Sequence, residues 1–95
     1  MKKEFYAVKI LANGTKELEK KEGDYDTRGV LFHKESDGWA VTDSYTGSVI
    51  IGSQPTKEDA KKTLAQMMPK VKNLRQGEGY LKAVINYQEK VANAK

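Results

Sequence analysis

The chain of 95 residues contains no cysteine, two prolines and a single histidine. The absence of cysteine excludes disulfides, thiolate nucleophiles, zinc–cysteine sites and iron–sulfur clusters. No apolar run approaches the roughly 20 residues that a membrane-spanning helix needs. The charged start, Met1–Glu4, is not followed by the apolar stretch of a signal peptide. We therefore expect a cytoplasmic protein that has no membrane partner.

The remaining composition fits one compact domain. Hydrophobic residues make up 38% of the chain and charged residues 32%. The hydrophobic residues concentrate in Phe5–Ala12 and Trp39–Ile51. A chain of this length can close one modest core but not two. We therefore predict a single domain that spans residues 1–95.

Short apolar or alternating runs, separated by turn residues, predict an antiparallel sheet of three to five strands. Asn13-Gly14, between the first two runs, is typical of a type I′ hairpin turn. Asp37-Gly38 indicates a second tight turn. The second run is also rich in helix-forming residues, so a short helix remains an alternative there. The expected strands are Glu4–Ala12, Thr15–Lys21, Arg28–Lys34, Trp39–Ser44 and Ser48–Gly52.

Two helices are expected after the strands, which makes the predicted fold class α+β. Thr56 can cap the first helix, with Asp59 completing a capping box, and apolar residues recur along one helical face. Pro69 predicts that this helix stops or kinks near Met68. The closing segment, Tyr80–Ala94, fits a helix better than a strand because of its length and composition. The sequence thus predicts a sheet packed by one N-capped amphipathic helix, with a second helix at the C-terminus.

Three patterns resemble functional motifs but lack a residue that the chemistry requires. Asp24–Glu35 has the acids and the glycine of a calcium-binding loop, but Arg28 stands where an oxygen ligand must bind. Gly47–Ser53 has the glycine spacing of a phosphate-binding loop without its lysine. His33 has no assignable partner for general-base catalysis. We therefore expect no catalytic residue, no metal and no cofactor, and hence a protein that is not an enzyme.

Positive charge is concentrated in the second half of the chain. Residues 1–52 hold eight Lys/Arg and nine Asp/Glu, whereas residues 53–95 hold nine Lys/Arg and four Asp/Glu. The second half could contact nucleic-acid phosphates, with Trp39 and Tyr45 stacking on bases. Alternatively, the same lysines form the solvated face of an ordinary amphipathic helix. The candidate phosphate contacts are Lys61, Lys62, Lys70, Lys72 and Arg75.

Four short segments follow one another between positions 28 and 67: Arg28-Gly29-Val30, Gly38-Trp39-x-Val41, Gly47-x-x-Ile50-Ile51-Gly52 and Thr56-x-Glu58-x-Ala60. Their order resembles that of AP2-like and integrase arm-binding domains. Those domains lay a three-stranded sheet into the DNA major groove and back it with a helix. It is also similar to the order seen in small uncharacterised bacterial and phage domains. The resemblance implies that Arg28, Lys34, Thr42 and Ser48 face DNA, with Trp39 supporting the sheet or touching the DNA backbone.

A protein-binding role is the alternative. A regulator or inhibitor encoded by a mobile element could bind a host protein, or a second copy of itself, through a strand edge or the C-terminal helix. The candidate interface residues on that helix are Tyr80, Leu81, Tyr87 and Val91, which could form an exposed apolar strip. The sequence therefore predicts a small binding or regulatory module. It leaves open whether the partner is DNA, RNA or a protein.

Overall fold

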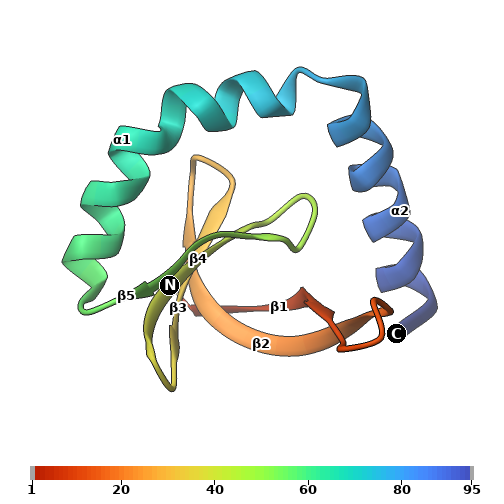
Figure 1. Ribbon diagram of the computed structural model, residues 1–95, viewed down its shortest axis with the longest axis horizontal. Coiled ribbons are helices and arrows are strands. Elements are labelled where there is room, and N and C mark those ends of the chain that lie inside the picture. Colours follow the sequence, from red (N-terminus) through yellow and green to blue (C-terminus); the bar gives the residue numbers. More distant parts are fainter. Residues whose placement is uncertain (1, 95) are drawn as a thin grey trace.

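The computed structural model describes residues 2–94, which form five strands followed by two helices (Figure 1). Each strand pairs antiparallel with the next one in the chain. The strands are β1 (Lys2–Ile10), β2 (Lys16–Asp26), β3 (Val30–Glu35), β4 (Gly38–Asp43) and β5 (Val49–Gln54), and the helices are α1 (Lys57–Arg75) and α2 (Glu78–Ala94). The predicted α+β class, with its N-capped helix and its C-terminal helix, is confirmed. Within residues 2–94, neither helix has the length and apolar content needed to cross a lipid bilayer.

The hairpin between β1 and β2 forms where the sequence predicts it, but with a different turn. Gly14 has a positive φ of +84° and Asn13 does not, whereas a type I′ turn needs two such residues. Asn13 contributes its side chain instead, because its Oδ1 accepts a hydrogen bond from the Thr15 N–H at 3.0 Å. Leu11 closes the loop by donating to the Thr15 carbonyl and accepting from the Gly14 N–H. The run Thr15–Lys21, for which a short helix was the alternative, lies almost wholly in strand β2.

Helix α1 covers one face of the sheet. Val30 and Val41 project to this face and are 0% exposed, and Leu64 of α1 is also 0% exposed against them. The alternation of residues along a strand places every second side chain of β3 in this core. The main core consists of Val30, Phe32, Val41, Ile51, Ala60 and Leu64.

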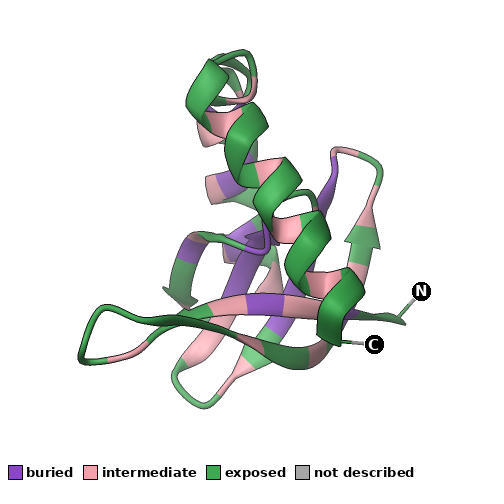
Figure 2. Cartoon of the chain, turned by 90° about the vertical axis from the view of Figure 1, so that its right-hand side faces the viewer, coloured by how far each residue is buried: buried purple, intermediate pink, exposed green. Residues whose placement is uncertain are grey.

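The first hairpin covers the opposite face of the sheet. β2 pairs with β1 along nine residues but with β3 along only three, so the sheet curls. The curl brings Phe5 and Ala7 of β1 against Leu31 of β3, and the Phe5 ring lies 5.2 Å from the His33 ring. β3 and β4 are mostly buried, as Figure 2 shows. Thr42, which the resemblance placed against DNA, is 0% exposed and cannot make that contact.

Helix α1 begins at the predicted cap and continues past its proline. Thr56 Oγ1 accepts from the Asp59 N–H at 3.1 Å and donates to the Asp59 carboxylate at 3.0 Å. The helix does not stop near Met68; it runs on and bends over the sheet (Figure 1). Pro69 removes the hydrogen bond to the Ala65 carbonyl. Because both residues are exposed, water can replace that bond.

Helix α2 turns back beside the sheet, so that the two helices form an arch (Figure 1). The helical interpretation of the closing segment is confirmed. None of the α2 residues is fully buried, and its outer face is exposed in Figure 2. Two phenol hydroxyls attach the helix to the sheet. Tyr80 donates to Asp43 Oδ2, and Tyr87 donates to the Tyr6 carbonyl, each at 2.5 Å.

A polar cluster on β3 makes the stability of the fold depend on pH. His33 is 3% exposed; its Nδ1 lies 2.8 Å from the Glu35 carboxylate and its Nε2 lies 2.7 Å from the Thr42 hydroxyl. Lys21 of β2 donates a further hydrogen bond to Glu35. Burial alone would raise the pKa of Glu35, but the hydrogen bonds from Lys21 and His33 outweigh it and hold that pKa below 4.5.

We expect acid to destabilise the fold through this cluster. When the chain unfolds, the pKa of Glu35 returns to its ordinary value of 4.5, so the unfolded state takes up the proton at a higher pH than the folded state. The stabilisation is present above pH 4.5 and is lost as the pH falls through the lower, folded-state pKa. Urea midpoints measured at decreasing pH should show this loss. Glu35→Gln should flatten the dependence, whereas Glu17→Gln, an exposed control, should leave it unchanged; an unaltered slope in Glu35→Gln contradicts the assignment.

Candidate functional site

The four lysines of α1 that the sequence offers as phosphate contacts are exposed but do not converge. Lys61 and Lys70 are nine residues apart, about 2.5 helical turns, so they project from opposite sides of the helix. Lys62 lies between these two directions. Lys72 shares the side of Lys61 but stands about 16 Å further along the axis. These lysines are spread over the solvated side of α1 and form no common phosphate site.

Arg75 supports the fold and is not the free phosphate contact that the charge pattern favoured. Its Nη2 lies 2.9 Å from Asp43 Oδ1, in an ion pair whose side chains are 20% and 5% exposed. Its two terminal nitrogens also donate to the carbonyls of Arg28 and Gly29. The end of α1 is therefore fastened to the one end of the β3–β4 pair where β3 begins and β4 ends.

The remaining residues predicted to bind nucleic acid lie at the two ends of β3, with Arg28 just before the strand and Lys34 near its end, opposite Trp39 of β4. Arg28 Nε donates to the Asp26 carboxylate at 2.8 Å, and this ion pair raises the pKa of Arg28 and lowers that of Asp26. Trp39 packs against the main core, with the Lys57 ammonium 5.6 Å from its ring. Lys34 is exposed on β3. Two α1 lysines lie near this set, Lys61 beside the Asp26 partner of Arg28 and Lys57 over Trp39. Arg28 and Lys57, however, are each paired with a carboxylate.

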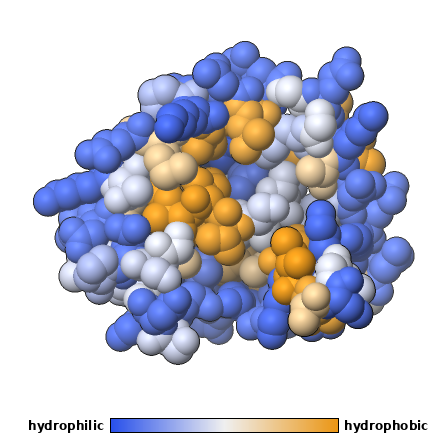
Figure 3. Space-filling view, in the orientation of Figure 1, coloured by the Kyte–Doolittle hydropathy of each residue, from blue (hydrophilic) through white to orange (hydrophobic). Residues whose placement is uncertain are grey.

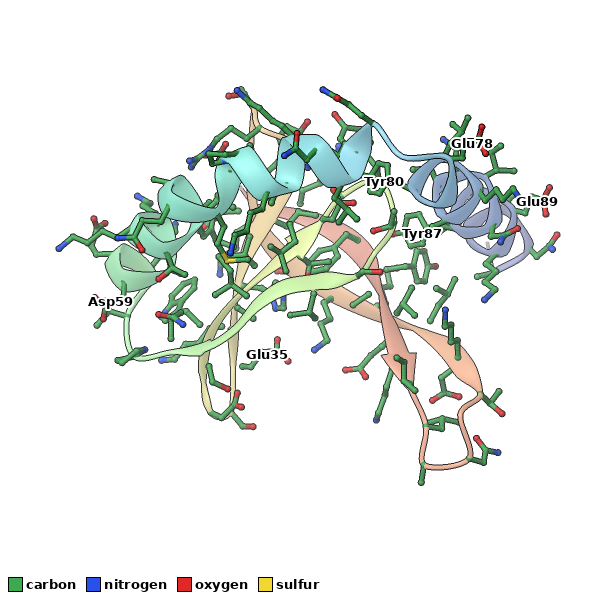
Figure 4. The ribbon with its side chains drawn as sticks, turned by 45° about the horizontal axis from the view of Figure 1, so that its top comes forward. Glu35, Asp59, Glu78, Tyr80, Tyr87 and Glu89 are labelled. Carbon is green, nitrogen blue, oxygen red and sulfur yellow. The ribbon has the colours of Figure 1, made fainter. Side chains whose placement is uncertain are left out.

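The four residues predicted as an apolar strip on α2 divide between two environments. Tyr80 and Tyr87 point from α2 toward the sheet (Figure 4), where their hydroxyls are bonded. Val91 is half-buried on the same side. Leu81 lies elsewhere on the helix and is 60% exposed. The predicted set is therefore not one interface.

Most of the aromatic side chains meet in one groove instead. The groove has a volume of about 560 Å³ and lies between the first hairpin, the turn after β4 and the inner side of α2. Five of the eight aromatic residues of the chain line it, together with two lysines. We call it the aromatic groove; its lining is Lys3, Glu4, Phe5, Tyr6, Lys20, Tyr25, Leu31, Ser44, Tyr45, Tyr87 and Val91.

Two tyrosines of the aromatic groove present rings to solvent. Tyr25, at the end of β2, is 42% exposed and Tyr45, in the turn after β4, is 46% exposed. The Lys3 ammonium lies 5.0 Å from the Tyr25 ring, and the Arg75 guanidinium lies 5.2 Å from the Tyr45 ring. Tyr45 is held close to Gly29, where a Cβ would lie 2.5 Å from the ring. Each of the two exposed rings thus has a cation beside it, and the contact with Gly29 holds the Tyr45 ring in place.

The wall of the groove is built by strand pairing and by α2. The register of β1 and β2 places Tyr6 opposite Lys20. Lys20 pairs with Glu4 at 2.9 Å, and hydrogen bonding from this carboxylate raises the pKa of Lys20. Both side chains of that pair are about 60% exposed, so the ion pair is weak and can give way to a phosphate. Burial raises the pKa of Tyr87, the α2 residue of the wall, and keeps its hydroxyl protonated.

A second groove, of about 310 Å³, lies under the arch of the helices. Figure 3 shows apolar side chains gathered in the centre of this face, with hydrophilic ones around them. The polar end of this groove is formed by Asp43, Arg75 and Tyr80, which bond to one another. Burial and the Asp43 carboxylate both raise the pKa of Tyr80. Its apolar lining is Val49, Ile50, Met67, Val71, Leu74 and Ala83.

The polar residues in the apparent motifs are engaged in local structure. Asp24 hydrogen-bonds Lys57, which lowers the pKa of Asp24, and Asp26 hydrogen-bonds Arg28. The buried His33 is enclosed by Glu35 and Thr42. Among residues 2–94, no group of three or more His, Asp or Glu side chains could hold a metal ion.

Comparison of the chain with protein-family models, with curated proteins and with solved structures returned no match. Function must therefore be inferred from the residues of the site itself.

Sequence patterns single out one ring of the aromatic groove, Tyr45, as a stacking residue. Tyr6, Tyr25 and the two lysines carry no local signal, because they stand on different strands and meet only through the curl of the sheet. Chemically, the groove combines flat apolar surfaces with two exposed ammonium groups. That combination suits a ligand made of planar rings joined by anionic links.

Proposed function

We propose that the protein binds single-stranded nucleic acid in the aromatic groove. Bases would stack on Tyr25 and Tyr45, and the neighbouring phosphates would contact Lys3 and Lys20. The observation that carries the proposal is the gathering of five of eight aromatic side chains with two lysines in one groove. The net charge of +4 further favours the approach of a polyanion.

A single strand fits this site better than a duplex. Stacking on tyrosine requires unpaired bases, whose faces are covered in a double helix. The volume of about 560 Å³ falls in the range of about 300–1,000 Å³ that is usual for small-ligand sites. Duplex binding would need a broad basic surface, and the α1 lysines point in different directions. A role as an accessory protein of bacterial or phage origin, located in the cytoplasm, remains part of this proposal.

The proposal is tested by fluorescence anisotropy with short labelled DNA and RNA strands and with the corresponding duplexes. Tyr25→Ala and Tyr45→Ala should each lose about 1–3 kcal/mol of binding free energy, the usual contribution of one stacked base. Tyr45→Phe keeps the ring and should bind nearly as tightly as the parent. If two lysines contact phosphates, the slope of log affinity against log salt should be about −1.4.

The matched control for charge is Lys62→Ala with Lys72→Ala on α1. Both lysines lie outside the aromatic groove, so their loss should weaken binding less than Lys3→Ala with Lys20→Ala. Thermal unfolding of each variant separates a loss of binding from a loss of fold. Unchanged affinity in the folded Tyr25→Ala and Tyr45→Ala proteins, or equal effects of the two lysine pairs, would contradict the proposal.

A further inference from the structure

Helix α2 carries a second apolar stripe that does not touch the sheet. The inner side of the helix carries Tyr80 and Tyr87, whose hydroxyls bond to the rest of the protein. On the outer side, Leu81 is 60% exposed and Ile85 is 47% exposed. Figure 4 places Glu89 on the side of α2 away from the sheet. A helix with apolar residues on both sides has one side without a partner within the described chain.

The outer stripe has the spacing of a coiled-coil seam. Leu81, Ile85, Gln88 and Ala92 follow one another at intervals of four, three and four residues, which is the repeat that keeps side chains facing a second helix. All four residues are exposed. The stripe is two heptads long at most, so it can form a short helix pair and no extended coil.

We propose that α2 pairs with α2 of a second copy of this chain, in antiparallel orientation, through this stripe. A two-fold axis between Ile85 and Gln88 would place Ile85 against Gln88 of the other copy, and Leu81 against its Ala92. Large residues then meet smaller or flexible ones in every layer of the seam. A polar residue such as Gln88 in the seam also fixes the register of the pair.

The charges beside the stripe complement themselves in this arrangement. Lys82 and Glu89 each directly follow a seam residue, so they lie on the same flank of the helix. In an antiparallel pair, equivalent flanks of the two helices face each other. Lys82 of one copy then lies within about 3 Å in axial level of Glu89 of the other. Because the dimer has two-fold symmetry, this Lys82–Glu89 contact occurs twice.

This charge pattern distinguishes a second copy from other occupants. A helix that lies on a membrane surface carries mainly cations beside its apolar face. This flank carries one cation, Lys82, and one anion, Glu89, which can pair with the same two residues of a second copy. In a parallel pair unlike flanks would meet, so Lys82 and Glu89 would face Val84 and Val91 of the partner and find no opposite charge. The rings proposed to stack on bases, Tyr25 and Tyr45, are not on α2 and stand apart from the seam.

A dimer would carry two aromatic grooves, one on each chain, and could therefore bind a nucleic-acid strand at two sites. A single short helix pair buries less than a standard interface of about 1,600 Å², so the dimer belongs to the weak, concentration-dependent class. Two aromatic grooves in one particle would hold a longer strand more tightly than one groove does. The dimer itself rests on the α2 stripe and does not depend on the proposed nucleic-acid binding.

Sedimentation velocity of the full chain, over a wide range of protein concentration, tests the inference. We expect a monomer–dimer equilibrium, and Ile85→Asp should weaken it by at least about tenfold because it places a charge in the seam. Leu74→Asp is the control, since Leu74 is an exposed apolar residue outside the stripe, at 63% against 47% for Ile85, and should leave the dimer unchanged. A strictly monomeric parent protein, or a larger effect of Leu74→Asp than of Ile85→Asp, overturns the inference.

Charge exchange gives the sharper measurement. Lys82→Glu alone and Glu89→Lys alone should each weaken self-association by about threefold to tenfold, because both flank contacts become repulsive. A mixture of the two single variants should associate at least as well as the parent, since every contact between unlike chains is then attractive. If the two substitutions weakened association by altering the fold of each single chain, mixing the variants would not restore it. Failure of the mixture to associate overturns the antiparallel pairing.

Discussion

Replacing Asp43 by alanine should lower the free energy of unfolding by about 3 kcal/mol. Asp43 is 4% exposed and accepts hydrogen bonds from Arg75 at 2.9 Å, Thr46 at 2.8 Å and Tyr80 at 2.5 Å. Its removal leaves the Arg75 guanidinium, whose Nε already has no hydrogen-bond partner, without its counter-ion. The value is placed at the lower end for buried ion pairs because the Arg75 side chain keeps 20% of its exposure.

Urea unfolding followed by the fluorescence of Trp39 measures this loss. Glu17→Ala is the control, because Glu17 is exposed and surface substitutions usually change stability by less than about 0.5 kcal/mol. Asp43→Ala should also detach α2, so the aromatic groove should lose its Tyr87 wall and bind more weakly. A destabilisation below about 1 kcal/mol would show that the three hydrogen bonds to Asp43 are dispensable.

Replacing Gly47 by alanine should cost about 2–4 kcal/mol of stability, because two separate penalties combine. Gly47 has a φ of +69°, which an alanine adopts only under strain. A Cβ at this position would lie 2.4 Å from the Tyr87 ring and 2.8 Å from the Tyr6 carbonyl oxygen. Tyr87 cannot simply move aside, since its hydroxyl is bonded to that same carbonyl.

Gly14→Ala separates the two penalties. Gly14 has a similar φ of +84° but open space where a Cβ would lie, so this variant measures the backbone strain alone. The difference between the two variants, obtained from urea unfolding, is then the cost of the contact with Tyr87 and Tyr6. If Gly47→Ala and Gly14→Ala lower the free energy of unfolding equally, then Tyr87 and Tyr6 move to accept the new Cβ without an energetic cost.

The sequence predicts the elements of this fold because their signals are local. Asn13-Gly14 and Asp37-Gly38 mark turns at the correct places, and Thr56 marks the start of α1. Of the two outcomes predicted at Pro69, a stop or a kink, the stop near Met68 is wrong, for a reason outside the local pattern. The carbonyl that Pro69 leaves without a donor faces solvent, so the helix loses little by continuing.

The site is predicted less well because it depends on the curl of the sheet. Tyr6, Tyr25, Tyr45 and Tyr87 come from four segments, and no periodicity relates them. They meet because β2 leaves β3 after three pairs and carries β1 across the sheet. Likewise, the second half of the chain does carry the excess of lysines that the sequence shows. The helical repeat of α1, however, makes these lysines project in different directions, so they form no single basic surface. Arg75 shows the same limit, since only the tertiary structure places Asp43 beside it.

The hydrogen bond between Tyr87 and Tyr6 joins residues 81 positions apart in the chain. The hairpins and the packing of α1 rest on contacts between nearer neighbours, which close at lower entropic cost during folding. We therefore expect helix α2 to dock last during folding and to open first. Since Tyr87 and Val91 form one wall of the aromatic groove, we expect the opening of this one helix, with the sheet still folded, to remove that wall and weaken the grip on a ligand.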